Sequence, residues 1–224
     1  MTALARWTTK YLNYSFSDTS LLTQALSHRS VGDDNNERLE FLGDGFLNLA
    51  IAQRLYELYP TYTEGDLSRL RASLVNGSTL QEIAVSLKLD QHIIVSKAER
   101  SSGGAQRASI IANAVEAIIG AVLLDSGYEA AQQVVDQLYL TRLDNLPSPD
   151  ELKDPKTRLQ EWLQARGSEL PEYVVEHVAG AAHAQTFSVS VKALGQTACA
   201  DGTSRRAAEQ EAARLLLGTL RHDE

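Results

Sequence analysis

Asn36 to Phe46 reads Asn-Glu-Arg-Leu-Glu-Phe-Leu-Gly-Asp-Gly-Phe, and this stretch places three carboxylates within an otherwise apolar helix. Glu37, Glu40 and Asp44 stand at positions i, i+3 and i+7, which puts them on one side of an α-helix. Carboxylates crowded near a core repel one another and resist desolvation, and a bound divalent cation relieves both costs. The spacing alone also allows an amphipathic helix with an ordinary acidic stripe.

The composition limits the kinds of protein and of metal site. The chain has 224 residues, of which 43% are hydrophobic, enough for one large domain or two small ones. Its only cysteine, Cys199, excludes an intramolecular disulfide and a cysteine-based metal site. Any metal must therefore be a hard, oxygen-ligated ion. Since no apolar run approaches about 20 residues, we expect a soluble cytoplasmic protein without a membrane partner.

The charge balance argues against a general nucleic-acid binder. The net charge is −8, with 12 basic and 17 acidic side chains up to Leu146 and 9 basic and 12 acidic side chains after it. A nucleic-acid-binding domain normally carries a basic excess. Affinity for RNA would have to come from the local placement of Arg and Lys.

The first 146 residues have a helical pattern, with apolar residues at spacings of three and four and no clear alternation. Residues 147–153 contain two prolines among polar residues and are expected to form a short linker. The predicted main helices are Ser20–His28, Glu37–Leu58, Glu64–Leu87, Ser109–Leu124 and Tyr128–Leu143.

Residues 154–224 follow a different pattern. Asp154 and Pro155 have the order expected of an N-cap and the first residue of a helix, which should end near Gly167. Three short strands are predicted at residues 173–178, 187–191 and 197–200, and a last helix at residues 204–220. The predicted order is α-β-β-β-α.

The acidic stretch resembles the signature of the ribonuclease III family, which Asn36 to Asp44 match at nine consecutive positions. Gly45 stands where the family usually has Ser, and this leaves the carboxylate pattern intact. Residues 109–120 resemble the second acidic helix of the family. Glu116 matches its glutamate, and Asn113 occupies the place of its aspartate. The resemblance implies an all-α catalytic and dimerisation domain over residues 1–146.

The second pattern, with the stretch Gly202-Thr-Ser-Arg-Arg-Ala-Ala-Glu-Gln, resembles a double-stranded-RNA-binding domain. The helix macrodipole disfavours Arg205 and Arg206 at a helix start, so their presence indicates a phosphate bound there; a solvated helix start is the alternative. His183 would contact the minor groove, or is an ordinary polar loop residue. The RNA-binding residues implied by the resemblance are Thr157, Gln160, Glu161, His183, Ser204, Arg205 and Arg206.

The resemblance implies a double-strand-specific endoribonuclease rather than an enzyme with a small-molecule substrate. Glu40, Asp44, Asn113 and Glu116 would hold Mg²⁺, with Mn²⁺ as a substitute, for attack of water on the RNA phosphodiester. Asp44 and Glu116 are the catalytic candidates. The products would carry 5′-phosphate and 3′-hydroxyl ends with short 3′ overhangs, as in the processing of ribosomal RNA precursors and structured transcripts.

Three residues have both a functional and a structural interpretation. Glu37 and Glu64 would lie at the edge of the cleft, for substrate positioning or a second metal, although a glutamate at a helix start such as Glu64 is also favoured by the dipole. Cutting both strands requires two sites, and the family forms a homodimer. Phe41 is then the candidate interface anchor, or an ordinary core residue.

Two other functions compete with cleavage. A cleavage-deficient protein that only binds double-stranded RNA is suggested by Asn113, which replaces the family aspartate. A helical scaffold with a protein-binding α/β module would require the acidic side chains to have no chemical role. Metal-dependent hydrolysis of a long RNA duplex distinguishes all three.

Overall fold

The structure is a computed structural model that describes residues 2–104, 107–181 and 184–222. The chain forms two compact units, Met1–Pro147 and Ser148–Glu224. We call them unit 1 and unit 2 and describe each by itself.

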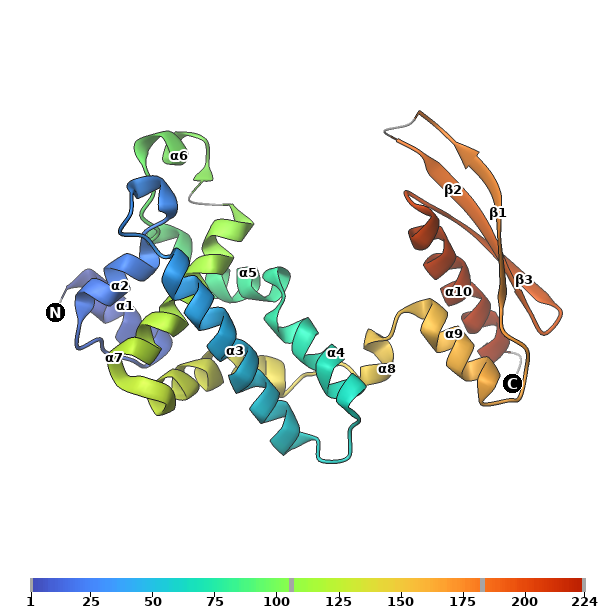
Figure 1. The fold of residues 1–224 in the computed structure, drawn as a ribbon, viewed down its shortest axis with the longest axis horizontal. Coiled ribbons are helices and arrows are strands. Elements are labelled where there is room, and N and C mark those ends of the chain that lie inside the picture. Colours follow the sequence, from blue (N-terminus) through green and yellow to red (C-terminus); the bar gives the residue numbers. More distant parts are fainter. Residues whose placement is uncertain (1, 105–106, 182–183, 223–224) are drawn as a thin grey trace. The chain divides into compact units, whose positions relative to one another are not determined.

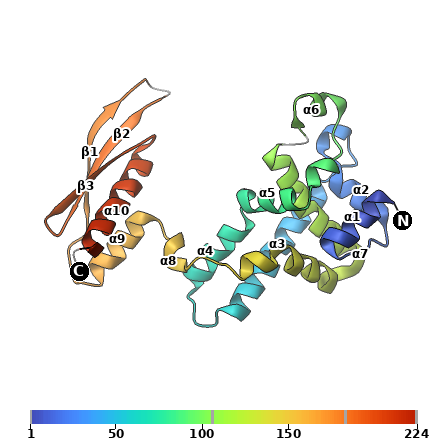
Figure 2. The ribbon, with the colours of Figure 1, turned by 180° about the vertical axis from the view of Figure 1, so that it is seen from behind.

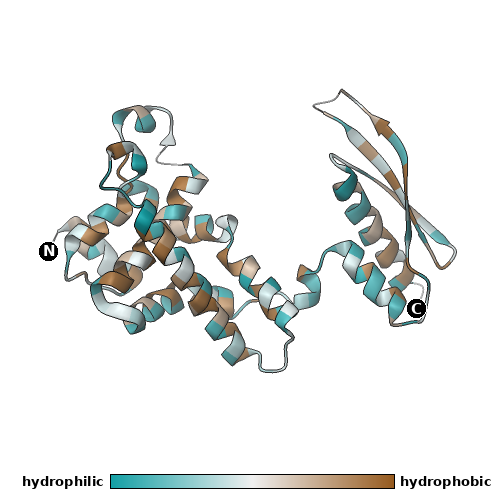
Figure 3. Cartoon of the chain, in the orientation of Figure 1, coloured by the Kyte–Doolittle hydropathy of each residue, from teal (hydrophilic) through white to brown (hydrophobic). Residues whose placement is uncertain are grey.

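Unit 1 is built from helices joined by loops (Figure 1), with one isolated bridge between Ser27 and Ile94. Helix α3 matches its predicted bounds, and α3 and α7 form the centre of the unit. Figure 3 shows hydrophobic positions recurring along both helices between hydrophilic ones, as expected of helices with one face in the core. The helices are α1 (Ala3–Leu12), α2 (Thr19–Leu26), α3 (Glu37–Leu58), α4 (Glu64–Val75), α5 (Gly77–Ser86), α6 (Lys97–Ser101) and α7 (Ala108–Leu143).

Two glycines allow α3 and α7 to cross in direct backbone contact. A Cβ atom added to Gly43 of α3 would lie 1.8 Å from the carbonyl oxygen of Glu116, and one added to Gly120 of α7 would lie 2.3 Å from the carbonyl oxygen of Leu39. Real Cβ atoms never approach that closely. The two helices lie side by side in both opposed views (Figures 1 and 2). Only glycine at these two positions permits this approach, which brings the acidic residues of the two helices together.

The single helix predicted over Glu64–Leu87 is wrong, because the chain breaks at Asn76 into α4 and α5. Asn76 has an extended backbone, and its side-chain oxygen accepts a hydrogen bond from the Thr79 amide at 2.9 Å. Its side-chain nitrogen donates to the Ser73 carbonyl at 2.8 Å. Asn76 thus caps both helix ends, a role in which asparagine is favoured over most other residues.

Helix α7 joins the two helices predicted at residues 109–124 and 128–143, with a kink at Gly127, where φ is 81°. Among the described residues, α7 alone is long and apolar enough to pass for a membrane span, a finding that the sequence prediction missed. Of its most apolar window, 61% is buried inside the structure. Burial of this kind is what a core helix requires.

Unit 2 has the predicted α-β-β-β-α order. Its antiparallel sheet has the strand order β1-β2-β3, and a compact apolar core that includes Leu159, Val191 and Leu216 lies between sheet and helices. The predicted linker differs, because a short helix with a Ser148–Glu151 capping box forms within it. The elements are α8 (Pro149–Leu152), α9 (Pro155–Gln164), β1 (Glu172–Ala179), β2 (Thr186–Ala193), β3 (Gln196–Gly202) and α10 (Arg205–His222).

Candidate active site

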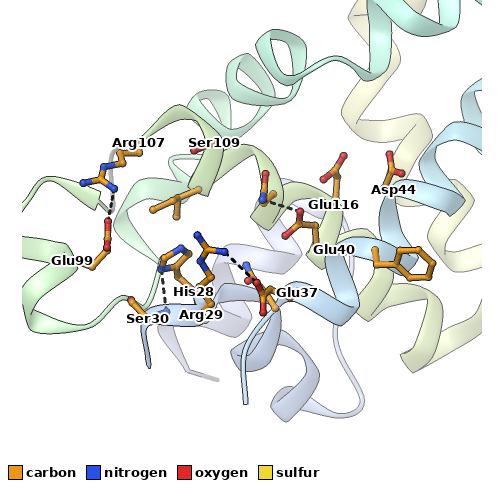
Figure 4. A pocket seen from close by; sticks show the side chains of 14 residues that line it. His28, Arg29, Ser30, Glu37, Glu40, Asp44, Glu99, Arg107, Ser109 and Glu116 are labelled. Carbon is orange, nitrogen blue, oxygen red and sulfur yellow. Dashed lines mark hydrogen bonds and ion pairs between the residues drawn. The ribbon is translucent and has the colours of Figure 1, made fainter. Parts of the chain in front are cut away.

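The crossing of α3 and α7 brings the four predicted metal ligands to one cleft of about 670 Å³. Glu40 and Asp44 come from α3, and Asn113 and Glu116 come from α7. Figure 4 shows Glu40, Asp44 and Glu116 together on one side of this cleft. Residues more than 60 positions apart in sequence therefore share one surface, because each pair lies on the contacting face of its helix.

Asn113 is hydrogen-bonded directly to Glu40. The Asn113 side-chain nitrogen donates to Glu40 Oε1 at 2.8 Å. Burial raises the pKa of Glu40, whereas this hydrogen bond opposes the rise. An aspartate at position 113 could not donate when ionised and would add a like charge. Asparagine therefore stabilises the cation-free arrangement of the two side chains.

Glu116 has the most perturbed carboxyl group of the cleft. Its burial, followed by the negative charges of Asp44 and Glu40, raises its pKa to about 7. Such a shift identifies a group whose ionised form lacks a compensating positive charge.

The other predicted acids occupy different positions. Asp44 is exposed and accepts a hydrogen bond from the Asn48 side chain at 2.9 Å. Glu37 lines the cleft with one oxygen 3.6 Å from Arg29 Nη1. Glu64 begins α4 and does not line the cleft; its Oε1 accepts a hydrogen bond from Ser68 Oγ at 2.6 Å.

Sequence reasoning missed the basic side of this cleft. Arg29 and Arg107 line it together with Glu99, and Arg107 Nη1 lies 2.9 Å from Glu99 Oε1 (Figure 4). Arg107 immediately precedes α7. The same argument that singled out Arg205, an arginine at a helix start, could have identified it. The cleft thus pairs carboxylates with guanidinium groups that suit a phosphate.

The donor atoms fit a hard divalent cation. Three carboxylates and one amide oxygen are the ligand types that Mg²⁺ accepts, and the raised pKa of Glu116 reflects negative charge that a cation would offset. Among the described residues, no three His, Cys, Asp or Glu side chains already stand close enough to hold a metal. The donor set is therefore suitable in chemistry, and the carboxylates would have to move closer together to bind a cation.

Phe41 is not a core residue of this subunit. It is 82% exposed, so the interpretation as ordinary core is wrong for the described chain. Phe41 lies beside an apolar hollow of about 310 Å³ that Leu42, Phe46 and Leu49 also line. An exposed phenylalanine next to a hollow is typical of a protein interface.

In unit 2, the predicted RNA-binding residues that the structure describes lie along α9 and at the start of α10. Ser204 Oγ accepts a hydrogen bond from the Ala207 amide, and Arg205 and Arg206 are exposed. Thr157 is held by the N-cap Asp154, and Gln160 is exposed. The carboxylate of Glu161 is paired with Lys153 at 2.6 Å. His183 lies outside the described residues.

Comparisons with known proteins agree with this division. Residues 18–143 match the family model described as Ribonuclease-III-like, and residues 155–220 match the model described as double-stranded RNA binding motif. A curated ribonuclease 3 of Dechloromonas aromatica is 48% identical over 94% of this chain and 96% of its own length. A ribonuclease 3 of Alkalilimnicola ehrlichii is 50% identical over 93% and 92%.

Solved structures match unit 1. A crystal structure of the nuclease domain of ribonuclease III from Campylobacter jejuni has a TM-score of 0.61 and 40% identity, covering 65% of this chain and 100% of that one. A second structure of that domain, described for flexibility in a region involved in dimer formation, has a TM-score of 0.60 and 42% identity, covering 62% and 98%. The matching family model and relatives that resemble this chain along nearly its whole length establish that it belongs to the ribonuclease III family.

Proposed function

We propose that this protein is a Mg²⁺-dependent endonuclease that hydrolyses double-stranded RNA. The observation that carries the proposal is the meeting of Glu40 and Asp44 with Asn113 and Glu116 in one cleft, at a backbone contact between α3 and α7. The double-stranded RNA binding motif over residues 155–220 supports a duplex as the substrate.

The protein's own residues would bind and orient the reactants. Glu40, Asp44, Asn113 and Glu116 would hold the metal, which when bound would activate water and stabilise charge on the phosphate. Arg29 and Arg107, on the basic side of the cleft, suit the phosphate groups of the substrate. Asp44 and Glu116 remain the catalytic candidates. Products with 5′-phosphate and 3′-hydroxyl ends and short 3′ overhangs belong to the proposal.

Asn113 does not make a binding-only protein the better proposal. Its amide oxygen is still a ligand for a hard cation, and the three carboxylates of the cleft are all present. The substitution predicts a weaker metal site. The processing of ribosomal RNA precursors and structured transcripts in the cytoplasm is the physiological role that we propose.

A homodimer is part of the proposal, because one cleft cuts one strand. Exposed Phe41 and the apolar hollow beside it supply a suitable contact surface on α3. In such a dimer, Glu64 would complete the partner's cleft, which would account for its position outside the cleft of its own subunit, whereas Glu37 stays at the edge of its own cleft.

The test is cleavage of a long, perfectly paired RNA of defined sequence, compared with each of its single strands. We expect Mg²⁺-dependent cutting of the duplex alone, no cutting in EDTA, and at least partial replacement of Mg²⁺ by Mn²⁺. End mapping should give 5′-phosphates and recessed 5′ ends. Intact duplex at saturating Mg²⁺ and Mn²⁺, with binding retained, would instead support the binding-only protein.

A further inference from the structure

A buried carboxylate in unit 2 connects the two helix starts that carry the predicted RNA-binding residues. Glu209 lies on α10 and is 8% exposed. Its Oε2 accepts a hydrogen bond from Lys156 Nζ of α9 at 2.5 Å, and its Oε1 accepts one from Arg205 Nε at 2.8 Å. Each oxygen of one carboxylate thus holds a cation from a different helix start.

The surroundings fix both cations. Lys156 Nζ also lies 4.3 Å from the centre of the Tyr173 ring on β1, a cation–π distance. Arg205 uses its Nε on Glu209, and its side chain is 65% exposed. A guanidinium has two further nitrogens, which can form a bidentate contact with a phosphate.

Glu209 remains charged at this buried position. The hydrogen bond from Lys156, reinforced by that from Arg205, lowers the pKa of Glu209. A buried carboxylate is retained at a cost in desolvation, which its two hydrogen-bonded cations offset. Its side chain is 10% exposed, whereas those of Lys156 and Arg205 are 35% and 65% exposed, so the two cations are more accessible to a ligand than the carboxylate is.

We propose that Glu209 is a positioning residue for duplex binding: it holds Arg205, and with it Lys156, in the orientation that engages RNA phosphates. This inference rests on the proposed binding of double-stranded RNA by unit 2. It assigns a role in RNA affinity to a negative charge, which simple electrostatics would count as unfavourable.

The direction in which one substitution changes RNA affinity distinguishes positioning by Glu209 from long-range electrostatics. Glu209→Gln removes a negative charge from unit 2, so long-range electrostatics alone predicts tighter binding of RNA. Positioning predicts the opposite, because the amide cannot hold two cations. We expect duplex affinity of the full chain, measured in EDTA to prevent cutting, to fall roughly fivefold, the effect of about one lost phosphate contact.

The matched control is Glu211→Gln on the same helix. Glu211 is half-buried and pairs with Arg214 at 2.6 Å, so this variant removes the same charge without affecting Arg205 or Lys156. Its affinity should be unchanged or slightly higher. Salt dependence gives a second measurement: the slope of log K against log salt should become shallower by about 0.9 in Glu209→Gln and stay the same in Glu211→Gln.

A loss of stability alone would not reproduce this pattern. The effects of Glu209→Gln and Arg205→Ala should combine less than additively, because both remove the same phosphate contact. If Glu209→Gln fails to fold by circular dichroism, Glu209→Asp replaces it, since it keeps the charge but retracts the carboxylate, and the same loss is expected.

The inference would be overturned by a folded Glu209 variant that binds duplex as tightly as the parent, with the parent's salt slope. Full additivity with Arg205→Ala would overturn it as well. Failure of the parent protein itself to bind duplex would contradict the proposed function instead, so the two failures are distinguishable.

Discussion

Asn113 offers two different atoms to its surroundings: its amide nitrogen donates to Glu40, and its amide oxygen is the atom that a cation would bind. In the structure the nitrogen is engaged, at 2.8 Å from Glu40 Oε1. The amide oxygen remains available as a neutral ligand in the proposed metal site. We therefore expect this cleft to bind the proposed metal less tightly than one with aspartate at position 113.

Asn113→Asp should lower the stability of the metal-free protein and raise its affinity for Mg²⁺. Without metal, the variant loses the hydrogen bond to Glu40 and gains a like charge, which should cost about 1–3 kcal/mol of unfolding free energy. With metal, we expect cleavage to reach half its maximal rate at Mg²⁺ concentrations lower by at least on the order of tenfold. Thermal unfolding against Mg²⁺ concentration should show a larger rise for the variant. Superimposable curves would remove Asn113 from the metal site.

Glu116 should make the metal-free protein less stable as pH rises. Burial, followed by the charges of Asp44 and Glu40, raises its pKa from 4.5 to about 7. A raised folded-state pKa means that stability is complete below the unfolded-state value and is lost as pH increases through the folded-state value. The unfolding temperature in EDTA should therefore fall between about pH 5 and about pH 8. In Glu116→Gln the unfolding temperature should fall less over this pH range. A fall as steep as that of the parent protein would contradict the raised pKa assigned to Glu116.

At the scale of elements, the packing of α3 against α7 depends on Gly43 and Gly120, whose surroundings are crowded. The surroundings of Gly45, on the same helix as Gly43, are open. A Cβ atom on Gly43 would overlap the Glu116 carbonyl oxygen, whereas one on Gly45 would meet nothing within 4 Å. Replacing each glycine by alanine therefore distinguishes the two effects: both variants change helix propensity, but only Gly43→Ala disturbs the contact between the helices.

Gly43→Ala should separate the helices and misalign the acidic residues. We expect a loss of about 1–3 kcal/mol from overpacking, together with a large loss of cleavage. Gly45→Ala should raise stability by up to about 1 kcal/mol, because alanine favours the helix, and should retain cleavage. Unfolding monitored by denaturant, with activity measured alongside, compares the two. A stable and fully active Gly43→Ala protein would be incompatible with the contact described here.

The sequence predicted the elements whose signals are local. The bounds of α3 follow from its periodicity and the start of α9 follows from its N-cap and proline. The break at Asn76 was missed because, in the sequence, an asparagine that caps two helices looks the same as an ordinary polar residue within one helix. Its hydrogen bonds to Ser73 and Thr79 are visible only in the structure. The resemblance brought Glu40 and Asn113 together as candidates, but their hydrogen bond depends on the contact between two distant helices.

At the scale of the whole molecule, two-strand cleavage requires two clefts. The exposed Phe41 provides the test of the proposed homodimer. Phe41→Ser should shift the protein toward monomer and weaken double-strand cutting more than duplex binding, because a buried aromatic anchor contributes about 2 kcal/mol or more to an interface. Sedimentation velocity at several concentrations measures the change.

Val85→Ser is the matched control for Phe41→Ser. Val85 is 63% exposed on α5, so its replacement also removes an exposed apolar side chain, but from a different helix. It should leave the sedimentation profile unchanged. A monomeric parent protein, or a Phe41→Ser protein with the parent's profile, would argue against this interface.

The most direct test of the central claim separates cutting from binding in the same protein. The claim is that the acids of α3 and α7 perform the chemistry while unit 2 supplies much of the RNA affinity. Glu116→Ala and Glu40→Ala should each abolish cleavage of a long RNA duplex in limiting Mg²⁺, since each removes a carboxylate from the cleft. Their duplex affinity, measured in EDTA, should stay within about twofold of the parent. Cleavage at the parent rate by either variant would contradict the account.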